Sequence, residues 1–252
     1  MELFLVACAS LLAGFVDSIV GGGGLVLLPA LFAAFPSTHP ATLLGVNKSA
    51  SLWGTAVATV QYSRRVTMDW RMLLPAAALS LAGSLVGAWL VTMVSPEFLR
   101  KVLPGVLLVV LIYTLAKKEL GRHHAPRLQG WAQTATAGGI GLAMGFYDGF
   151  FGPGTGSLLV FLFVRLLGYD FLHASASAKL LNSCSNFAAL TLFAFKGHIW
   201  WHYALALALA NVIGSLLGTR MALKHGAGFV RWVFVLVVGV LILKTGYDAF
   251  LR

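Results

Sequence analysis

The sequence predicts an all-α integral membrane protein made of two inverted repeats, and three observations lead to this fold class. Of the 252 residues, 59% are hydrophobic and only 10% are charged, whereas roughly a quarter of the residues in a soluble protein are charged. Apolar stretches long enough to span a bilayer recur along the whole chain. An acidic residue followed by a run of glycines also occurs twice, in one register.

The formal net charge of +10 does not indicate nucleic acid as a partner. The basic residues are scattered between apolar runs, whereas nucleic-acid binders gather them on one face or in a tail. The lipid bilayer explains their placement better. Cys8 and Cys184 both fall in apolar segments with no CxxC pattern, so no disulfide is expected. The first 20 residues lack the basic start and cleavage site of a signal peptide, so we expect a retained first helix.

The spanning helices are located by length, since a hydrocarbon core of about 30 Å needs about 20 apolar residues. About eight longer segments meet this condition: 2–20, 41–62, 71–94, 98–117, 131–150, 171–195, 203–223 and 229–250. Two shorter apolar pieces, 25–35 and 157–167, each follow a glycine run. We expect each to be a half-helix that forms a broken hairpin with the segment before it. Pro153 in the second glycine run favours such a break.

The duplication is visible in two motifs, GFVDSIVGGGG from Gly14 and GFYDGFFGPGTG from Gly145. Asp17 and Asp148 lie 131 positions apart (148 − 17), and polar pairs farther along share that offset without a gap. These further pairs are Lys48 with Lys179 and Arg100 with Arg231. Because charged residues are rare in this chain, chance does not explain their common register.

The repeat defines the organisation of the chain and its orientation. We predict a membrane repeat over 1–118, a basic linker over 119–130 and a second membrane repeat over 131–252. If each hairpin starts and ends on one side, an odd number of crossings remains per repeat, and the copies are inverted. With the N-terminus outside, eleven basic residues fall on the inner side and five on the outer side. The positive-inside rule therefore predicts both termini outside and the linker in the cytoplasm.

Lysines within spanning segments are costly, so Lys48 and Lys179 are candidates for a functional site. Each begins a polar stripe on one helical face, at the spacing i, i+3 and i+7. The predicted polar binding residues are Lys48, Ser51 and Thr55 in the first repeat, Lys179, Asn182 and Asn186 in the second, and Asn47 beside the first lysine. A competing interpretation is structural: each lysine pairs with the aspartate of its own repeat and holds the hairpin.

The glycine runs suit an anion, because a broken helix presents free N–H groups and a positive dipole end to a cavity. The predicted contacts from these turns are Gly22, Gly23, Gly24, Gly154, Thr155 and Gly156. The alternative is close helix packing, which small residues also permit, and we expect packing for the Gly83/Gly87 and Gly214/Gly218 pairs. No Lys-Ser/Thr follows either run, so no nucleotide and no other cofactor is expected.

Histidines offer weaker signals. His198 and His202 have an i, i+4 spacing that can bind a metal, but no carboxylate or cysteine completes the set. Their aromatic neighbours indicate the membrane interface. We therefore predict no metal site there, and His173, near the start of a helix, is left without an assigned role.

The two glycine motifs, together with NK at Asn47–Lys48 and AKLLNSCSN from Ala178, resemble the TauE/SafE family of membrane permeases, also called the sulfite exporter family. The resemblance covers nearly the whole chain and includes motif order, duplication and length. It implies transport of a small anion, such as sulfite, a sulfonate or a related organic acid, across a bacterial-type inner membrane. Pro153 and Thr155 depart from the first glycine run, so we expect unequal half-sites.

The function predicted from these features is secondary transport of a small oxyanion, bound near the bilayer midplane between the repeats, and a homodimer is compatible with it. Asp17 and Asp148 are the proton-coupling candidates. Each can neutralise a lysine of its own or the opposite repeat, and an anion that takes this lysine favours a proton on the aspartate. The sequence leaves two alternatives. One is an intramembrane hydrolase that uses both aspartates or Ser157, and no other catalytic residue is expected. The other is an anion channel.

Overall fold

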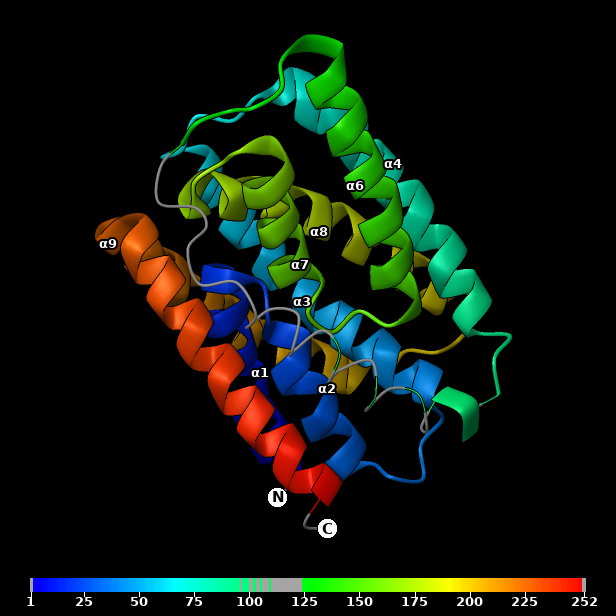
Figure 1. The fold of residues 1–252 in the computed structure, drawn as a ribbon. Helices are drawn as coiled ribbons and strands as arrows, with labels where there is room; N and C mark the ends of the chain where they lie inside the picture. The colour runs from blue at the N-terminus through cyan, green and yellow to red at the C-terminus, as the bar shows by residue number, and fades with distance from the viewer. Residues whose placement is uncertain are drawn as a thin grey trace.

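The computed structural model describes residues 2–95, 97–99, 102, 105, 109 and 124–250, with the side chains of the last helix described through 226 and at 229 and 232. Every regular element in this part of the chain is a helix, as the sequence predicts. In chain order these are α1 (Glu2–Val20), α2 (Gly23–Ala34), α3 (Pro40–Ser63), α4 (Trp70–Val91), α6 (Gly130–Phe150), α7 (Thr155–Leu162), the π-helix η1 (Phe163–Leu167), α8 (Phe171–Phe195) and α9 (Trp201–Phe250) (Figure 1).

Most predicted segments match these helices closely. The two short pieces are present as α2 and as α7 continued by η1, and both follow a break at a glycine run. α9 is interrupted at Gly226, whose φ of 73° and ψ of −166° are not helical, so it consists of two helical segments. The predicted helix over 98–117 lies mostly outside the described residues.

The long polar helices α3 and α8 begin at equivalent positions, because 39 and 170 share the repeat offset. His39 Nδ1 accepts a hydrogen bond from the Ala41 N–H at 3.2 Å, and Pro40 fixes the first helical residue. Asp170 accepts from the His173 N–H at 2.8 Å. Both caps bind backbone N–H groups that would otherwise lack a partner at the start of the helix. The caps thereby fix the residue at which each helix begins, and so the direction in which its lysine points.

Each half of the chain packs mainly against the other half. α1 lies along α9, and α4 lies along α6, so the first helix of one half contacts the fourth helix of the other. Gly14 meets the backbone carbonyl of Asn211, and Gly145 meets that of Ser80, with no room for a Cβ at either glycine. The two contacts are related by the same offset of 131 (145 − 14). Sequence duplication thus becomes duplicated packing.

The small-residue pairs extend these contacts, as the sequence predicts. Gly83 and Gly87 of α4 lie on the backbone of α6, and their equivalents Gly214 and Gly218 of α9 lie on the backbone of α1. Their backbone partners are Leu142, Phe146, Leu11 and Phe15. Such close approach is typical of membrane helices, where packing and not water exclusion drives association.

The outer surface suits lipid. Among the described residues, three helical stretches are long and apolar enough to cross a membrane: Glu2–Val20, Trp70–Val91 and Trp201–Gly226. Large apolar side chains, including Phe4, Trp131 and Phe195, project outward. An exposed apolar surface this extensive is unfavourable in water but is covered in a bilayer.

Candidate functional site: crossed ion pairs at two glycine turns

The two glycine turns meet inside the protein. Gly21 and Gly156 touch through their backbones, and a Cβ on either would overlap the other turn. The Ser157 N–H donates to the Gly21 carbonyl at 3.0 Å. Gly21 and Gly152 also have φ values of 82° and 88°, a region that favours glycine. The sequence therefore needs glycine here for both backbone conformation and close approach.

The broken end of α1 is satisfied by side chains from three other helices. The Tyr62 hydroxyl donates to the Ser18 carbonyl at 3.0 Å, and the Ser157 hydroxyl donates to Val20 at 3.1 Å. The Ser175 hydroxyl donates to the Ile19 carbonyl at 3.4 Å. Helix ends buried away from water need such partners. These bonds explain how α1 can stop within the protein interior.

Two ion pairs lie beside the turns, and all four charged groups are buried. Lys48 Nζ is 2.6 Å from Asp148 Oδ1, and Lys179 Nζ is 2.9 Å from Asp17 Oδ2. The exposed fractions are 1% for Lys48, 0% for Lys179, 8% for Asp17 and 2% for Asp148. Buried charges that lack a partner are strongly destabilising, so each lysine depends on its aspartate.

The pairs cross between the halves, because each lysine binds the aspartate of the opposite repeat. The interpretation that each lysine pairs within its own repeat is therefore wrong. Packing explains the exchange: α3 lies against α8, and the turn after α6 reaches across to α3. A Cβ on Gly152 would lie 3.0 Å from Lys48 Nζ, so the bare turn makes room for the ammonium group.

The two half-sites differ in how their carboxylates are bound. Asp17 Oδ1 accepts from the Gly23 N–H at 3.3 Å while Oδ2 holds Lys179, so both oxygens have partners. Asp148 Oδ2 is buried and has no hydrogen-bond partner in the described part of the chain. This carboxylate oxygen is the least satisfied acceptor of the four at the ion pairs.

The sequence departures in the second glycine run account for the difference. Gly154, the equivalent of Gly23, has a left-handed φ of 78°, and α7 begins one position later, at Thr155. The Thr155 hydroxyl donates to the Gly152 carbonyl at 2.8 Å and so closes its own turn. The predicted inequality of the half-sites is confirmed, and its cause is the shifted start of α7.

A hollow of about 250 Å³, including the open space at its mouth, lies between the turns and the polar stripes. Both repeats line it, and several lining residues are repeat equivalents. The lining consists of Asp17, Gly21, Gly24, Asn47, Lys48, Ser51, Asp148, Gly152, Gly154, Gly156, Asn182 and Asn186. Most of the residues predicted to bind an anion are therefore brought together.

Five predicted residues do not line the hollow: Lys179, Thr55, Gly22, Gly23 and Thr155. Lys179 faces Asp17, which itself borders the hollow, and Gly23 also binds that carboxylate. The Thr55 hydroxyl donates within its own helix, to the carbonyls of Ser51 at 2.8 Å and Leu52 at 3.0 Å. These residues support the lining and do not form it.

Two lining residues, Gly21 and Gly152, are missing from the predicted contacts. The signal for them was available, since they form a matched pair in the repeat register. A matched glycine next to a helix break indicates a backbone that needs positive φ. That argument identifies the turn residues themselves, and not only the first residues of the following half-helices.

The geometry does not match the hydrolase alternative. Each aspartate forms an ion pair with a lysine, and the Ser157 hydroxyl donates to the Val20 carbonyl at the end of α1. Ser157 therefore acts as a cap.

His198 stacks on His39, with ring centroids 5.3 Å apart, at the start of α3. Burial, and then the nearby His39 and Lys196, lower the pKa of His198, so its ring tends to be neutral.

Comparison with known proteins agrees with this architecture. The family model described as "Sulfite exporter TauE/SafE" matches residues 6–245. The chain belongs to the TauE/SafE family. A curated relative from Escherichia coli (strain K12), "Probable membrane transporter protein YfcA", is 38% identical over 248 residues, which cover 98% of this chain and 89% of the relative.

Two further relatives carry similar names. "Probable membrane transporter protein ORF9" of Sinorhizobium sp is 38% identical and covers 91% of this chain and 86% of its own length. A "Probable membrane transporter protein" of Haemophilus influenzae is 32% identical, and the match covers 98% of this chain and 95% of the relative. No solved structure gives a significant match. This TauE/SafE protein is a membrane transporter and not an enzyme.

The crossed pairing makes a testable prediction about stability. Lys48→Met and Asp148→Asn should each destabilise the purified protein, because each leaves a buried charge whose partner is gone, at a cost of about 3–5 kcal/mol. The double variant has no such charge, so its loss of stability should be much smaller than the sum. Thermal unfolding in detergent measures all three.

The matched control combines Lys48→Met with Asp17→Asn, which are not paired, and their effects should come close to adding. Stronger coupling of Lys48 to Asp17 than to Asp148 would contradict the crossed arrangement.

Proposed function

We propose that this protein is a secondary transporter of a small anion, bound between the two glycine turns and the polar stripes near the bilayer midplane. A sulfur-containing oxyanion, an organosulfonate or a related organic acid is the expected substrate class. The family description supports the sulfur chemistry. The observation that carries the proposal is the hollow itself, whose lining combines glycine backbone, amide side chains and Lys48 with the two paired carboxylates Asp17 and Asp148.

The size of the hollow favours a small ion. The empty space of about 250 Å³ includes the open space at the mouth, so the enclosed part is smaller still and suits a small ion better than a large ligand. The lining residues are polar or glycine, which suits a hydrated ion that exchanges water for fixed donors. A larger apolar ligand would find few partners here.

Lys48 is the cation best placed for the anion. Its ammonium group contacts Asp148 Oδ1 and donates to Asn186 Oδ1 at 3.1 Å, which leaves one of its three N–H donors for a ligand. The half-helices α2 and α7 start at the glycine turns, so their positive dipole ends add to the attraction. The site thus combines one charged donor with backbone N–H groups.

We further place the chain in the inner membrane as two inverted repeats, with both termini outside. The excess of basic residues in the loops on one side supports this, and Figure 1 draws both chain ends toward the end of the bundle opposite residues 124–130.

Tags at residues 1 and 252 should be accessible to a reagent outside the cell, and a tag within 119–127 should be protected from it. A terminus on the same side as the linker tag would refute the inversion.

The anion-binding role of Lys48 can be measured directly. Lys48→Gln should raise the Kd of sulfite or a small sulfonate about tenfold or more, since a hydrogen bond to a charged group contributes about 1.5–3 kcal/mol. Lys179→Gln should raise it less, because Lys179 lies outside the lining. Binding to purified, folded protein is the measurement.

Lys48→Gln removes a positive charge and also leaves Asp148 without its partner. Making the same substitution in Asp148→Asn protein separates these two effects. In Asp148→Asn protein, removing Lys48 should still weaken anion binding. Unchanged affinity in every lysine variant would mean that the lysines have a structural role and do not bind the anion. Saturable counterflow in proteoliposomes then identifies a carrier, while flux without counterflow would indicate the channel alternative.

Proton coupling is the mechanism that the charges favour. Two lysines and two aspartates sum to zero at this buried site, so an entering anion adds an uncompensated negative charge. A proton that arrives with the anion restores neutrality in a poorly hydrated cavity. Anion and proton then move in the same direction, as in a symporter.

Asp148 is the better proton acceptor of the two carboxylates. Its Oδ2 is buried without a partner, and its lysine is the one that lines the hollow. When an anion draws Lys48 away, Asp148 loses its counter-charge, and the protonated form becomes favourable. Asp17 keeps Lys179 and the Gly23 N–H throughout. The two aspartates, equivalent in sequence, therefore have different roles.

This asymmetry predicts the pH dependence of affinity. For a sulfonate that does not titrate, binding to the wild type should tighten as pH falls from about 8 to 5, by up to about tenfold per pH unit for one coupled proton. Asp148→Asn should flatten that slope, and Asp17→Asn should retain it.

A wild type with pH-independent affinity would rule out coupling at this site. Loss of the slope in Asp17→Asn alone would assign the proton to the other half-site.

A further inference from the structure

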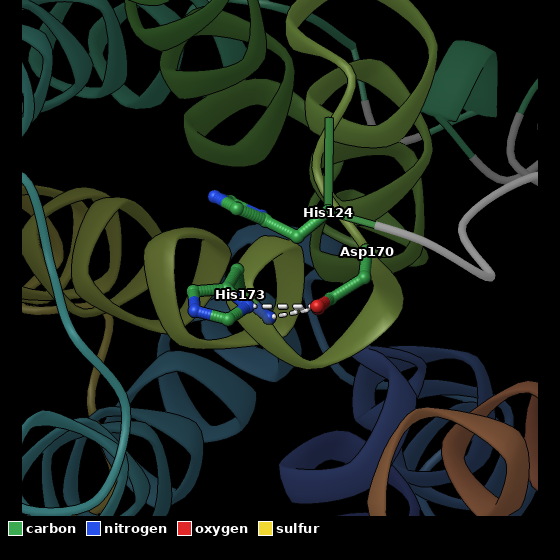
Figure 2. A group of neighbouring side chains, drawn as sticks. All are labelled: His124, Asp170 and His173. Carbon is green, nitrogen blue, oxygen red and sulfur yellow. Dashed lines mark hydrogen bonds and ion pairs between the residues drawn. The ribbon is translucent and has the colours of Figure 1, made fainter. Parts of the chain in front are cut away.

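A second polar cluster lies away from the hollow, where the linker reaches the start of α8. It contains His124, Asp170 and His173, and one potential ligand atom from each lies within 4.8 Å of the other two. Figure 2 shows the two imidazole rings lying side by side, with the Asp170 carboxylate against His173. The ring centroids are 4.1 Å apart.

We propose that these three residues form a binding site for a divalent transition-metal ion of the zinc type. Imidazole nitrogens and carboxylate oxygens are the donors that such ions take. Three protein ligands leave a coordination position for water, which is the pattern of an open zinc site.

The geometry is close to that of a coordinated ion. His173 Nδ1 lies 3.0 and 2.9 Å from the two Asp170 oxygens. Ligand atoms at about 2.0–2.1 Å from a tetrahedral zinc ion lie roughly 3.3 Å from one another, so this hydrogen-bonded pair would separate by only about 0.3 Å to share an ion. His124 is exposed, and one of its ring nitrogens lies within 4.8 Å of the ligand atoms of Asp170 and His173.

The surrounding backbone holds the third ligand in place. The Ala125 N–H donates to the Gly168 carbonyl at 2.9 Å, and the Arg127 N–H donates to the Leu167 carbonyl at 3.0 Å. These bonds fix the end of the linker beside the turn that leads into α8. Asp170 is itself the cap of α8, so its carboxylate is oriented before any ion binds.

The donor set fits metal binding, because ions of the zinc type take neutral imidazole nitrogens and carboxylate oxygens as ligands. An anionic carboxylate beside two imidazoles is a better metal site than two imidazoles alone.

The repeat supplies an internal comparison at the other end of the bundle. The equivalents of Asp170 and His173 are His39 and Thr42, and there the cap stacks on His198, which also contacts the Thr42 hydroxyl at 3.3 Å. Within the part of the chain that the structure describes, that cluster offers two imidazoles and no carboxylate paired with them. It serves as the matched control.

A bound ion would connect the linker to the helix that carries Lys179, Asn182 and Asn186. The sequence separates His124 from His173 by 49 positions (173 − 124), so a shared ligand would join segments that the chain does not keep together. The site joins the linker to the second half of the chain and does not belong to the anion hollow.

The test is titration of the purified full-length protein, free of any histidine tag, with zinc chloride in a calorimeter. The wild type should bind one zinc ion per chain at this site. His124→Ala and His173→Gln should each weaken binding at least tenfold, and His198→Gln should leave it unchanged. Asp170→Asn keeps a good helix cap, so a loss of affinity there reports the carboxylate and not misfolding.

Failure of the wild type to bind zinc would overturn the proposal, as would wild-type affinity in both His124→Ala and His173→Gln. Anion binding measured on the same samples is independent of this result, so the transport proposal and the metal site succeed or fail separately.

Discussion

Neutralisation of buried charge is the constraint on which the structure depends. Two lysines and two aspartates lie in an apolar chain, each at most 8% exposed, and an isolated charge in such surroundings costs far more than a typical fold can tolerate. The ion pairs satisfy the constraint only when the two halves are together, because each pair takes one residue from each half. The charges therefore specify how the two halves meet.

Close backbone approach makes that meeting feasible. Glycines on α1, α4, α6 and α9 allow carbonyl groups of the facing helices to sit where side chains would otherwise be. Serine hydroxyls bond across two neighbouring interfaces, α4 with α8 and α9 with α3. Ser84 donates to the Ser185 carbonyl, and its equivalent Ser215 donates to the Gly54 carbonyl, both at 2.6 Å. In a bilayer, where exclusion of water contributes little between helices, such packing and hydrogen bonding supply the association energy. Tight packing at the surrounding interfaces supplies the stability that a hollow with polar walls does not.

Much of this could be predicted from the sequence, and the remainder has identifiable physical reasons. Apolar length and the charged pairs at one offset predict the helices, the breaks and the polar stripes. The partner of each lysine could not be predicted, because both possible pairings preserve the same offset and the choice depends on helix packing. The difference between Asp17 and Asp148 arises from a one-residue shift in where α7 begins, and Pro153 and Thr155 indicate only that some difference exists. The cluster of His124 with His173 depends on where the linker lies, which a local pattern does not encode.

The bond from the Ser157 N–H to the Gly21 carbonyl has a consequence for how such a protein diverges. It joins the two turns through main chain alone, and the glycines around it contribute by having no side chain. Substitutions at Asn47, Ser51, Asn182 or Asn186 can therefore change the polar groups that line the hollow without moving the point at which the turns cross. Backbone atoms set the crossing and side chains set the lining, so the scaffold can keep its architecture while the chemistry of the hollow changes.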